Sequence, residues 1–192
     1  MARLSIADPE RRAGLYPHEF SGGMRQRVAI AIAVANGPRL LIADEPTTAL
    51  DVTVQAQIIE LLVELTLSRG LGMILITHDL GLVAGVADEI AVMYAGRIVE
   101  RGSTEEVFAA RAHPYTRGLL ASLPRIDAAG RLAPIGGAPP SPVRLPQGCA
   151  FHPRCAFRTE RCATVAPELA AHGRVRVSCH QREAIPPPGL GQ

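Results

Sequence analysis

The chain has 192 residues, of which 47% are hydrophobic, and its formal net charge is +2. This apolar content suffices for a packed core, and so small a charge, with the arginines dispersed along the chain, argues against a nucleic-acid partner. All 20 Lys+Arg residues are arginines, which excludes from these residues the G-x-x-x-x-G-K-[ST] phosphate loop, because that loop needs a lysine.

The first residues carry no export signal. Asp8 and Pro9 fall where a secretory signal needs its apolar stretch. No window approaches the roughly 18 uncharged apolar residues that a membrane span requires. We therefore expect a cytosolic protein with no transmembrane segment of its own, in which disulfides are a poor use for the cysteines.

The first well-marked helix is predicted to start at Ser21, a favourable N-cap, and to stop at Asn36-Gly37-Pro38. Gly22 and Gly23 at its start leave backbone N–H groups and the positive dipole end open to an anion. We therefore expect a phosphate contact at this turn. Taken alone, the tripeptide is equally well explained by a glycine turn before an ordinary amphipathic helix.

A fully buried strand is predicted at residues 40–43, since every residue there is apolar. Asp44 and Glu45 follow it, so they emerge at its carboxyl end, where ligands gather in open parallel sheets. Asp44 is expected to hold Mg²⁺ directly or through water. Glu45 is expected to orient, or take a proton from, the water that attacks a terminal phosphate. The alternative is a pair of solvated acids at a strand end.

A second strand is predicted at residues 73–77, after a helix that Asp51 caps. Strand, helix and strand at this spacing imply a right-handed parallel crossover. If the two strands are neighbours, His78 lies on the same sheet edge as Glu45 and is expected to contact the terminal phosphate. A structural role is the more usual one for a histidine that ends a strand.

The second half begins with a hairpin and then changes character. Residues 89–94 and 97–100 flank a predicted turn, and a capping box at residues 103–106 opens one more helix. From Pro124 onward, prolines and glycines favour extended, irregular chain. We place a domain boundary there, which gives domains 1–123 and 124–192.

Four cysteines lie in the second domain with the spacing C-x5-C-x6-C-x16-C: Cys149, Cys155, Cys162 and Cys179. The segment is too short and proline-rich for a large core, and a bound metal would supply the missing stability. Four thiolates suit Zn²⁺ or an iron–sulfur cluster, and the absence of C-x2-C pairs weakens the zinc-ribbon interpretation. His152 and His180 are alternative ligands, and free structural thiols remain the other interpretation.

Four motifs in chain order resemble those of ABC transporter ATPases. The signature motif, the Walker B strand with its catalytic glutamate, the D-loop and the switch histidine correspond to residues 20–27, 40–45, 49–51 and 77–79. Three longer stretches are similar to the ATPases of oligopeptide, dipeptide and nickel importers: residues 44–53, 113–120 and 148–155.

The resemblance implies an α/β fold. It would be a partial P-loop NTPase (ABC ATPase) domain with parallel strands and helices, followed by an irregular Pro/Cys-rich extension. It also implies ATP hydrolysis with ATP and Mg²⁺, coupled to uptake of peptides or nickel. The implied catalytic residues are Glu45 and His78. The implied nucleotide contacts are Ser21, Gly22, Gly23, Gln26, Asp44 and Asp51. A [4Fe-4S] cluster on the four cysteines is favoured over Zn²⁺, since importers of this kind can carry one.

In that family two ATPases pair head to tail, and each nucleotide lies between the Walker A loop of one and the signature of the other. The expected partners are thus a second ATPase subunit and membrane permease subunits, with the protein peripheral on the cytoplasmic face of the inner or plasma membrane. Because these residues hold no Walker A loop, the chain looks like the C-terminal part of such a subunit. The alternative is a non-catalytic truncated scaffold whose tail binds a metal or an iron–sulfur cluster.

Overall fold

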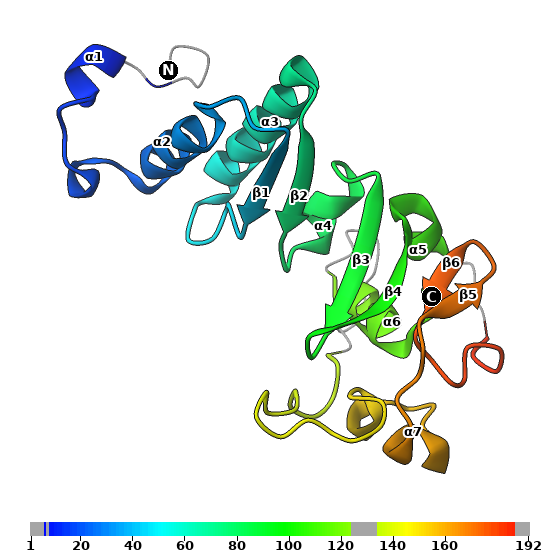
Figure 1. Cartoon of the computed structure of the whole chain (residues 1–192). Helices are drawn as coiled ribbons and strands as arrows, with labels where there is room; N and C mark the ends of the chain where they lie inside the picture. The colour runs from blue at the N-terminus through cyan, green and yellow to red at the C-terminus, as the bar shows by residue number, and fades with distance from the viewer. Residues whose placement is uncertain (1–5, 7, 124–133, 187–192) are drawn as a thin grey trace, which may run out of the picture. The chain divides into compact units, whose positions relative to one another are not determined.

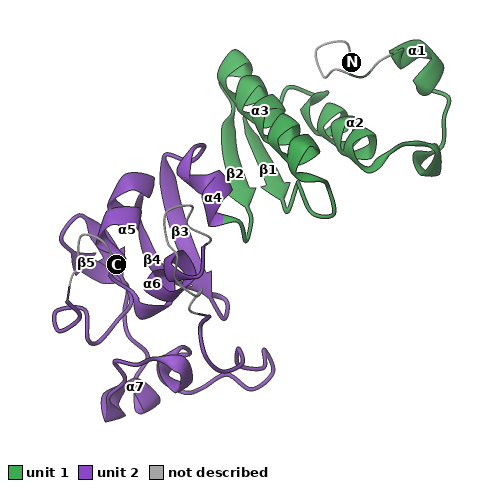
Figure 2. Cartoon of the chain, turned by 180° about the vertical axis from the view of Figure 1, so that it is seen from behind, with its two compact units in different colours: residues 1–79 green, residues 80–192 purple. Residues whose placement is uncertain are grey.

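The computed structural model describes residue 6 and residues 8–123 and 134–186 (Figure 1). The chain divides into two compact units, residues 1–79 and 80–192 (Figure 2). The predicted boundary between residues 123 and 124 falls at the edge of a stretch outside the described residues, so the division into domains there stays a prediction. No described helix is both long and apolar enough to span a membrane.

The first unit is built on two parallel strands. β1 (Leu40–Asp44) pairs in parallel with β2 (Gly72–Ile76), and α3 (Val52–Arg69) connects them. The helix lies alongside both strands in the two views (Figures 1 and 2). The predicted parallel crossover is thereby confirmed. The side chains that α3 buries are those of Ile58, Ile59, Leu61, Leu62 and Leu65.

One face of this small sheet stays open to solvent, so the prediction that residues 40–43 form a fully buried strand is wrong: alternate residues of β1 are exposed. Alternate residues of a strand point to the same side, and the strands pair Ile42 with Ile74. Ile42 is 61% exposed and Ile74 48% exposed, whereas Leu41 and Ala43 on the other face of β1 are buried. Four aliphatic side chains share the open face: Leu40, Ile42, Ile74 and Ile76.

The helix that carries the glycine turn packs beside α3. α2 (Gly22–Val34) follows a short α1 (Pro9–Arg12) and a 3-10 turn (Pro17–Glu19). The Arg69 guanidinium of α3 donates a hydrogen bond to the Val34 carbonyl of α2, with Nη1 2.9 Å from the oxygen. This bond satisfies a carbonyl at the end of α2 that has no partner within the helix.

The second unit is built around an antiparallel sheet in the order β3-β4-β6-β5. β3 (Glu89–Tyr94) and β4 (Arg97–Ser103) form the predicted hairpin. β5 (Ala170–His172) and β6 (Val175–Val177) form a second hairpin in the tail, which the sequence did not predict. β6 pairs with β4, so the tail and the hairpin share one sheet.

Short helices flank this sheet, and two of them start at capping side chains. The Ser103 hydroxyl accepts the Glu106 N–H, and His113 Nδ1 accepts the Tyr115 N–H at 3.0 Å. These caps satisfy backbone donors at the helix starts. The helices are α4 (Leu80–Ala84), α5 (Thr104–Ala110), α6 (Pro114–Ala121) and α7 (Glu160–Thr164), with a 3-10 turn at His152–Arg154.

A buried carboxylate connects β4 to the start of α6. Glu100 is fully buried, and its two oxygens accept the N–H groups of Ala112 at 2.8 Å and His113 at 2.9 Å. The His113 side chain is 1% exposed. Burial lowers the pKa of His113 to about 4, because an imidazolium would lose its hydration there. The unit therefore buries a neutral imidazole as well as a hydrogen-bonded carboxylate.

An arginine holds the proline-rich segment of the tail against the sheet. The Arg154 guanidinium lies 5.9 Å from the ring centres of Tyr94 and Phe151. It also donates hydrogen bonds to the carbonyls of Ile135 and Gly136 at 3.0 and 2.8 Å. Cation–π contact and paired hydrogen bonds together fix this otherwise irregular chain.

Candidate nucleotide site

Glu45 starts a sharp turn immediately after β1. Its φ of 47° is in the left-handed region, which a non-glycine residue seldom adopts. Its backbone N–H donates to the Ile76 carbonyl at the end of β2, at 2.9 Å. The backbone N–H of Glu45 therefore joins the carboxyl ends of the two strands.

His78 reaches Glu45 across this sheet edge. Its Nδ1 lies 2.9 Å from Glu45 Oε2 and 3.0 Å from Oε1. The structure thus brings together the two residues for which we predicted catalytic roles, although those roles themselves stay predictions. The His78 side chain is 80% exposed, so the pair is accessible to a ligand.

The pair shifts the protonation of both partners. The hydrogen bond from His78, and then the one from Thr48, lowers the pKa of Glu45. The hydrogen bond and the negative charge of Glu45 raise the pKa of His78, with a smaller contribution from Asp79. The ion pair is complete between these two pKa values: it is lost when Glu45 protonates at low pH and when His78 deprotonates at high pH.

Thr48 is a site residue that sequence reasoning missed. Its hydroxyl donates to Glu45 Oε2 at 2.8 Å, from three residues farther along the chain. The signal in the sequence was weak, because a hydroxyl three residues after an acid is common. The contact depends on the positive φ at Glu45, which a sequence pattern does not show.

The glycine turn lies at the start of α2 as predicted, with Ser21 as its N-cap. The Ser21 hydroxyl accepts the Met24 N–H at 3.4 Å. Gly22 and Gly23 pack closely on the segment after the β1 turn. A Cβ on Gly23 would lie 2.6 Å from Val54 Cγ1, and one on Gly22 would lie 3.1 Å from Leu50 Cδ2. Packing therefore favours glycine at residue 23 in addition to any approach of a phosphate, whereas at residue 22 a small shift of the Leu50 methyl would make room.

The other predicted nucleotide contacts are placed by the same elements. Asp44 ends β1 opposite Ile76 and is exposed. Asp51 is the N-cap of α3, where its Oδ1 accepts the Val54 N–H at 3.0 Å. Gln26 lies half-buried in the first turns of α2. Asp51 thus has a structural role that a nucleotide contact would have to share.

The acids suit Mg²⁺ only together with a nucleotide. Among the described residues no group of three or more His, Cys, Asp or Glu side chains is arranged to hold a metal ion. Mg²⁺ commonly takes one or two carboxylates and completes its shell with waters and substrate phosphates. Asp44 and Glu45 meet that lower requirement.

The cysteines give the metal prediction no support. All four are free, and Cys155, Cys162 and Cys179 are buried. Burial, with a smaller contribution from neighbouring thiols, raises the pKa of Cys149 and Cys155, and that of Cys179 to about 11. The thiols are thus near one another, yet no three ligands in the described chain are arranged to bind a metal.

The two histidines considered as alternative ligands are engaged with the backbone. His152 Nδ1 lies 2.9 Å from the Cys149 carbonyl oxygen, and His180 Nε2 lies 2.9 Å from that of Val165. A nitrogen that bonds a carbonyl oxygen must carry a proton, so the lone pair of each ring is on its other nitrogen. The [4Fe-4S] and Zn²⁺ predictions are without support because the described residues contain no group of three or more ligands arranged to hold a metal.

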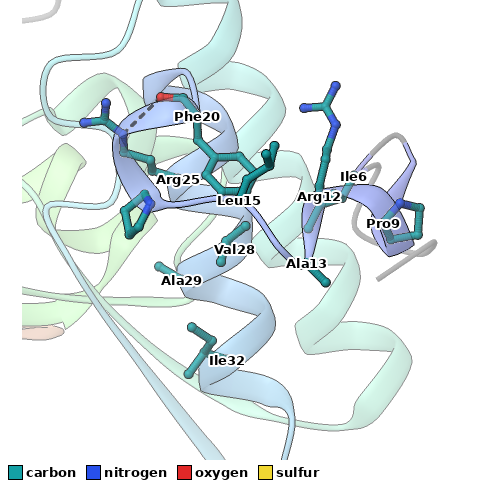
Figure 3. Close-up of a pocket in the computed structure, with 11 residues that line it drawn as sticks. Ile6, Pro9, Arg12, Ala13, Leu15, Phe20, Arg25, Val28, Ala29 and Ile32 are labelled. Carbon is teal, nitrogen blue, oxygen red and sulfur yellow. Dashed lines mark hydrogen bonds between the residues drawn. The ribbon is translucent and has the colours of Figure 1, made fainter.

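A separate hollow lies in the first unit, between α1, the loop after it and α2 (Figure 3). Its volume is about 430 Å³, and its charged lining residues are Arg12 and Arg25. Arg25 Nε donates to the Phe20 carbonyl at 3.1 Å, the bond dashed in Figure 3. None of the predicted nucleotide contacts lines this hollow.

Comparison with known proteins identifies the family. The family described as "ABC transporter" matches residues 1–48, and "Oligopeptide/dipeptide transporter, C-terminal region" matches residues 99–162. The oligopeptide transport ATP-binding protein OppD of Haemophilus influenzae is 53% identical over 90% of this chain. This chain belongs to the ATP-binding proteins of ABC transporters. The resemblance predicted from the motifs is confirmed.

Further relatives define the branch of the family. The dipeptide transport ATP-binding protein DppD of Haemophilus influenzae is 53% identical over 92% of this chain and 54% of its own length. OppD of Mycobacterium tuberculosis is 56% identical over 86% of this chain and 28% of its own length. This chain also covers 54% of the Haemophilus OppD, so it spans about half the length of the Haemophilus relatives and a smaller share of the Mycobacterium one. These relatives are named for peptides, and nickel finds no support.

A solved structure agrees with the predicted fold class. An inward-facing, putative metal-chelate type ABC transporter matches 58% of this chain and 44% of its own chain, at 28% identity and a TM-score of 0.51. The α/β class predicted from the motifs is therefore confirmed.

Proposed function

We propose that the chain forms part of the ATP-binding subunit of an ABC importer, which couples ATP binding and hydrolysis to peptide uptake. The observation that carries the proposal is the contact between Glu45 and His78 at the joined ends of β1 and β2. Relatives named for oligopeptide and dipeptide transport favour a peptide as the transported substrate.

The proposed chemistry divides between three side chains. Asp44 would hold Mg²⁺ together with water and phosphate oxygens, and the bound ion would supply positive charge next to the transferred phosphoryl group. Glu45 takes a proton from, or orients, the attacking water. His78, whose pKa is raised by Glu45, offers a positive charge to the terminal phosphate. In this structure the imidazole is paired with the Glu45 carboxylate. A phosphate would therefore compete with Glu45 for His78.

The turn at Ser21 serves a different nucleotide in this proposal. Its N-capped helix start presents N–H groups to phosphate oxygens, and the nucleotide is held by the phosphate loop of a second ATPase subunit in a head-to-tail pair. The proposed position is peripheral, on the cytoplasmic face of the membrane, bound to permease subunits. Because these residues contain no lysine, the isolated polypeptide is expected to show no ATPase activity of its own.

The test uses cells that make this protein, with Glu45→Gln introduced at the native gene. Uptake of a radiolabelled tripeptide should fall by about 100-fold or more, the usual contribution of a general base. Glu60→Gln is the matched control, since Glu60 is exposed on α3 and should leave uptake unchanged. Uptake at the parental rate in the Glu45→Gln cells would refute the proposal.

A further inference from the structure

We infer that Thr48 is a positioning residue, whose hydroxyl keeps Glu45 Oε2 occupied and so leaves Oε1 for the attacking water once His78 has moved to phosphate. This inference rests on the proposed function. It adds a residue to which we had assigned no role in the reaction and states what its side chain does. Three features of the turn after β1 support it.

The first feature is how the hydrogen bonds are shared between the two carboxylate oxygens. Oε2 accepts from Thr48 Oγ1 at 2.8 Å and lies 2.9 Å from His78 Nδ1, whereas Oε1 lies 3.0 Å from the same nitrogen. If the imidazole leaves, Oε1 loses that nitrogen, whereas Oε2 keeps the Thr48 hydroxyl. The backbone of His78 also hydrogen-bonds the Glu45 carboxylate and stays in place. The hydroxyl thus makes the two oxygens inequivalent, and a water that approaches Glu45 finds Oε1 without the imidazole.

The second feature is that Thr48 is held by the backbone of the turn. Its N–H donates to the Glu45 carbonyl at 3.2 Å, and the Glu45 N–H is bonded to Ile76 of β2. The preceding residue, Thr47, is buried, and its carbonyl accepts from the Gln55 side chain of α3 at 3.2 Å. Contacts with strand β2 and helix α3 therefore fix the backbone position from which the Thr48 hydroxyl extends.

The third feature is the contrast in freedom between the two partners of Glu45. His78 comes from a different strand end and is 80% exposed, so it can exchange the carboxylate for another anion without disturbing packing. Thr48 is three residues away in the same closed turn, so its hydroxyl stays within reach of the carboxylate as long as the turn is closed. A hydrogen bond to a carboxylate is charge-assisted and stronger than a neutral one, so the hydroxyl holds Oε2 on its own.

The experiment removes His78 first and then asks what Thr48 does. In the whole 192-residue chain labelled with ¹³C, the Glu45 carboxyl carbon is titrated by NMR in His78→Ala, His78→Ala/Thr48→Val and His78→Ala/Thr48→Ser. We expect the pKa of Glu45 to stay below its ordinary value of 4.5 with threonine or serine at residue 48. With valine, which has the same shape but no donor, it should rise toward that value, while the backbone hydrogen bond from residue 78 remains.

A second readout from the same samples reports position directly. Scalar couplings across the Glu45 Cα–Cβ bond should indicate one rotamer with threonine or serine, and an average over rotamers with valine. Thr53→Val in the His78→Ala background is the matched control, because Thr53 is exposed on the first turn of α3. Amide spectra of each variant check that the fold is intact; Thr48 is itself exposed.

Two outcomes overturn the inference: an unchanged pKa of Glu45 with valine at residue 48, or an unchanged rotamer distribution. Neither readout needs nucleotide, so both are independent of the proposed function. If Glu45→Gln leaves peptide uptake intact while Thr48→Val changes the pKa and rotamers of Glu45, the proposed function fails. The positioning of Glu45 by Thr48 is then still supported. If Glu45→Gln abolishes uptake but the pKa and rotamers of Glu45 do not depend on residue 48, only the positioning role fails.

Discussion

The fully buried carboxylate of Glu100 accepts the backbone N–H of His113 at 2.9 Å. The second oxygen takes the N–H of Ala112. Through these two bonds one side chain of β4 fixes the start of α6, where His113 is the N-cap. The second unit therefore depends on a polar group at its centre, which makes it sensitive both to substitution and to pH.

Glu100→Ala should destabilise the second unit strongly. The change leaves two buried N–H groups without an acceptor, at about 1–3 kcal/mol each. Urea unfolding followed by tyrosine fluorescence measures the loss, because Tyr94 and Tyr115 lie in this unit. Glu105→Ala, an exposed acid on α5, should change stability by no more than about 0.5 kcal/mol. Equal effects of the two substitutions would contradict the role of Glu100.

Stability should fall as the pH drops from 7 toward 4, because of His113. Its pKa of about 4 in the folded chain is below the ordinary value of 6.5, so the unfolded chain takes up the proton first. The difference corresponds to a loss of up to about 3 kcal/mol, complete once both states are protonated. His113→Asn keeps an N-cap acceptor and should flatten this part of the urea-unfolding profile. His18→Asn, at an exposed site, should leave the profile as it is.

Gly23→Ala should weaken the contact between α2 and α3. The new methyl group would lie 2.6 Å from Val54 Cγ1, and overpacking of this kind costs about 1–3 kcal/mol. Val54→Ala in the same chain should restore most of that loss, which a double-mutant cycle on thermal unfolding measures. Gly85→Ala is the control, since no atom lies within 4 Å of the added carbon. Additive effects of the two changes would show that the glycine and the valine do not compete for space.

Gly148→Ala should open the tail. The added carbon would collide with the Cys162 carbonyl oxygen and lie 2.7 Å from the Ala163 carbonyl carbon, and backbone atoms cannot rotate away. We expect the buried Cys162 thiol to react with a disulfide reagent at least about tenfold faster, as local opening exposes it. Gly136→Ala, which meets no atom within 4 Å, should react like the parent. Unchanged thiol reactivity after Gly148→Ala would mean that the tail accommodates the added methyl group without opening.

Local signals in the sequence were sufficient for the elements that carry the site. Ser21 and Asp51 were predicted as N-caps and are N-caps. The aliphatic run after Arg39 is strand β1, and the rule for parallel strands correctly placed Glu45 and His78 on one edge. In each case neighbouring residues or the strand periodicity decide the outcome.

Contacts between distant segments were beyond the sequence. The pairing of Glu100 with Val177 brings the tail into the sheet, and the short β6 strand gives little periodicity from which to predict it. The close approach of Gly23 to Val54 depends on how two helices cross. The cysteine spacing suggested a metal site that the described residues do not form. Spacing along the chain does not show in which directions the thiols point.

The open face of the β1–β2 sheet affects how the protein behaves as a sample. Ile42 and Ile74 place half-exposed aliphatic surface side by side, and sulfate strengthens the tendency of such surface to leave water. Concentrated stocks should therefore precipitate early in ammonium sulfate. Exchanging both isoleucines for threonine, which keeps the β-branched shape that strands favour, should raise the precipitation threshold while leaving the His78–Glu45 pair in place.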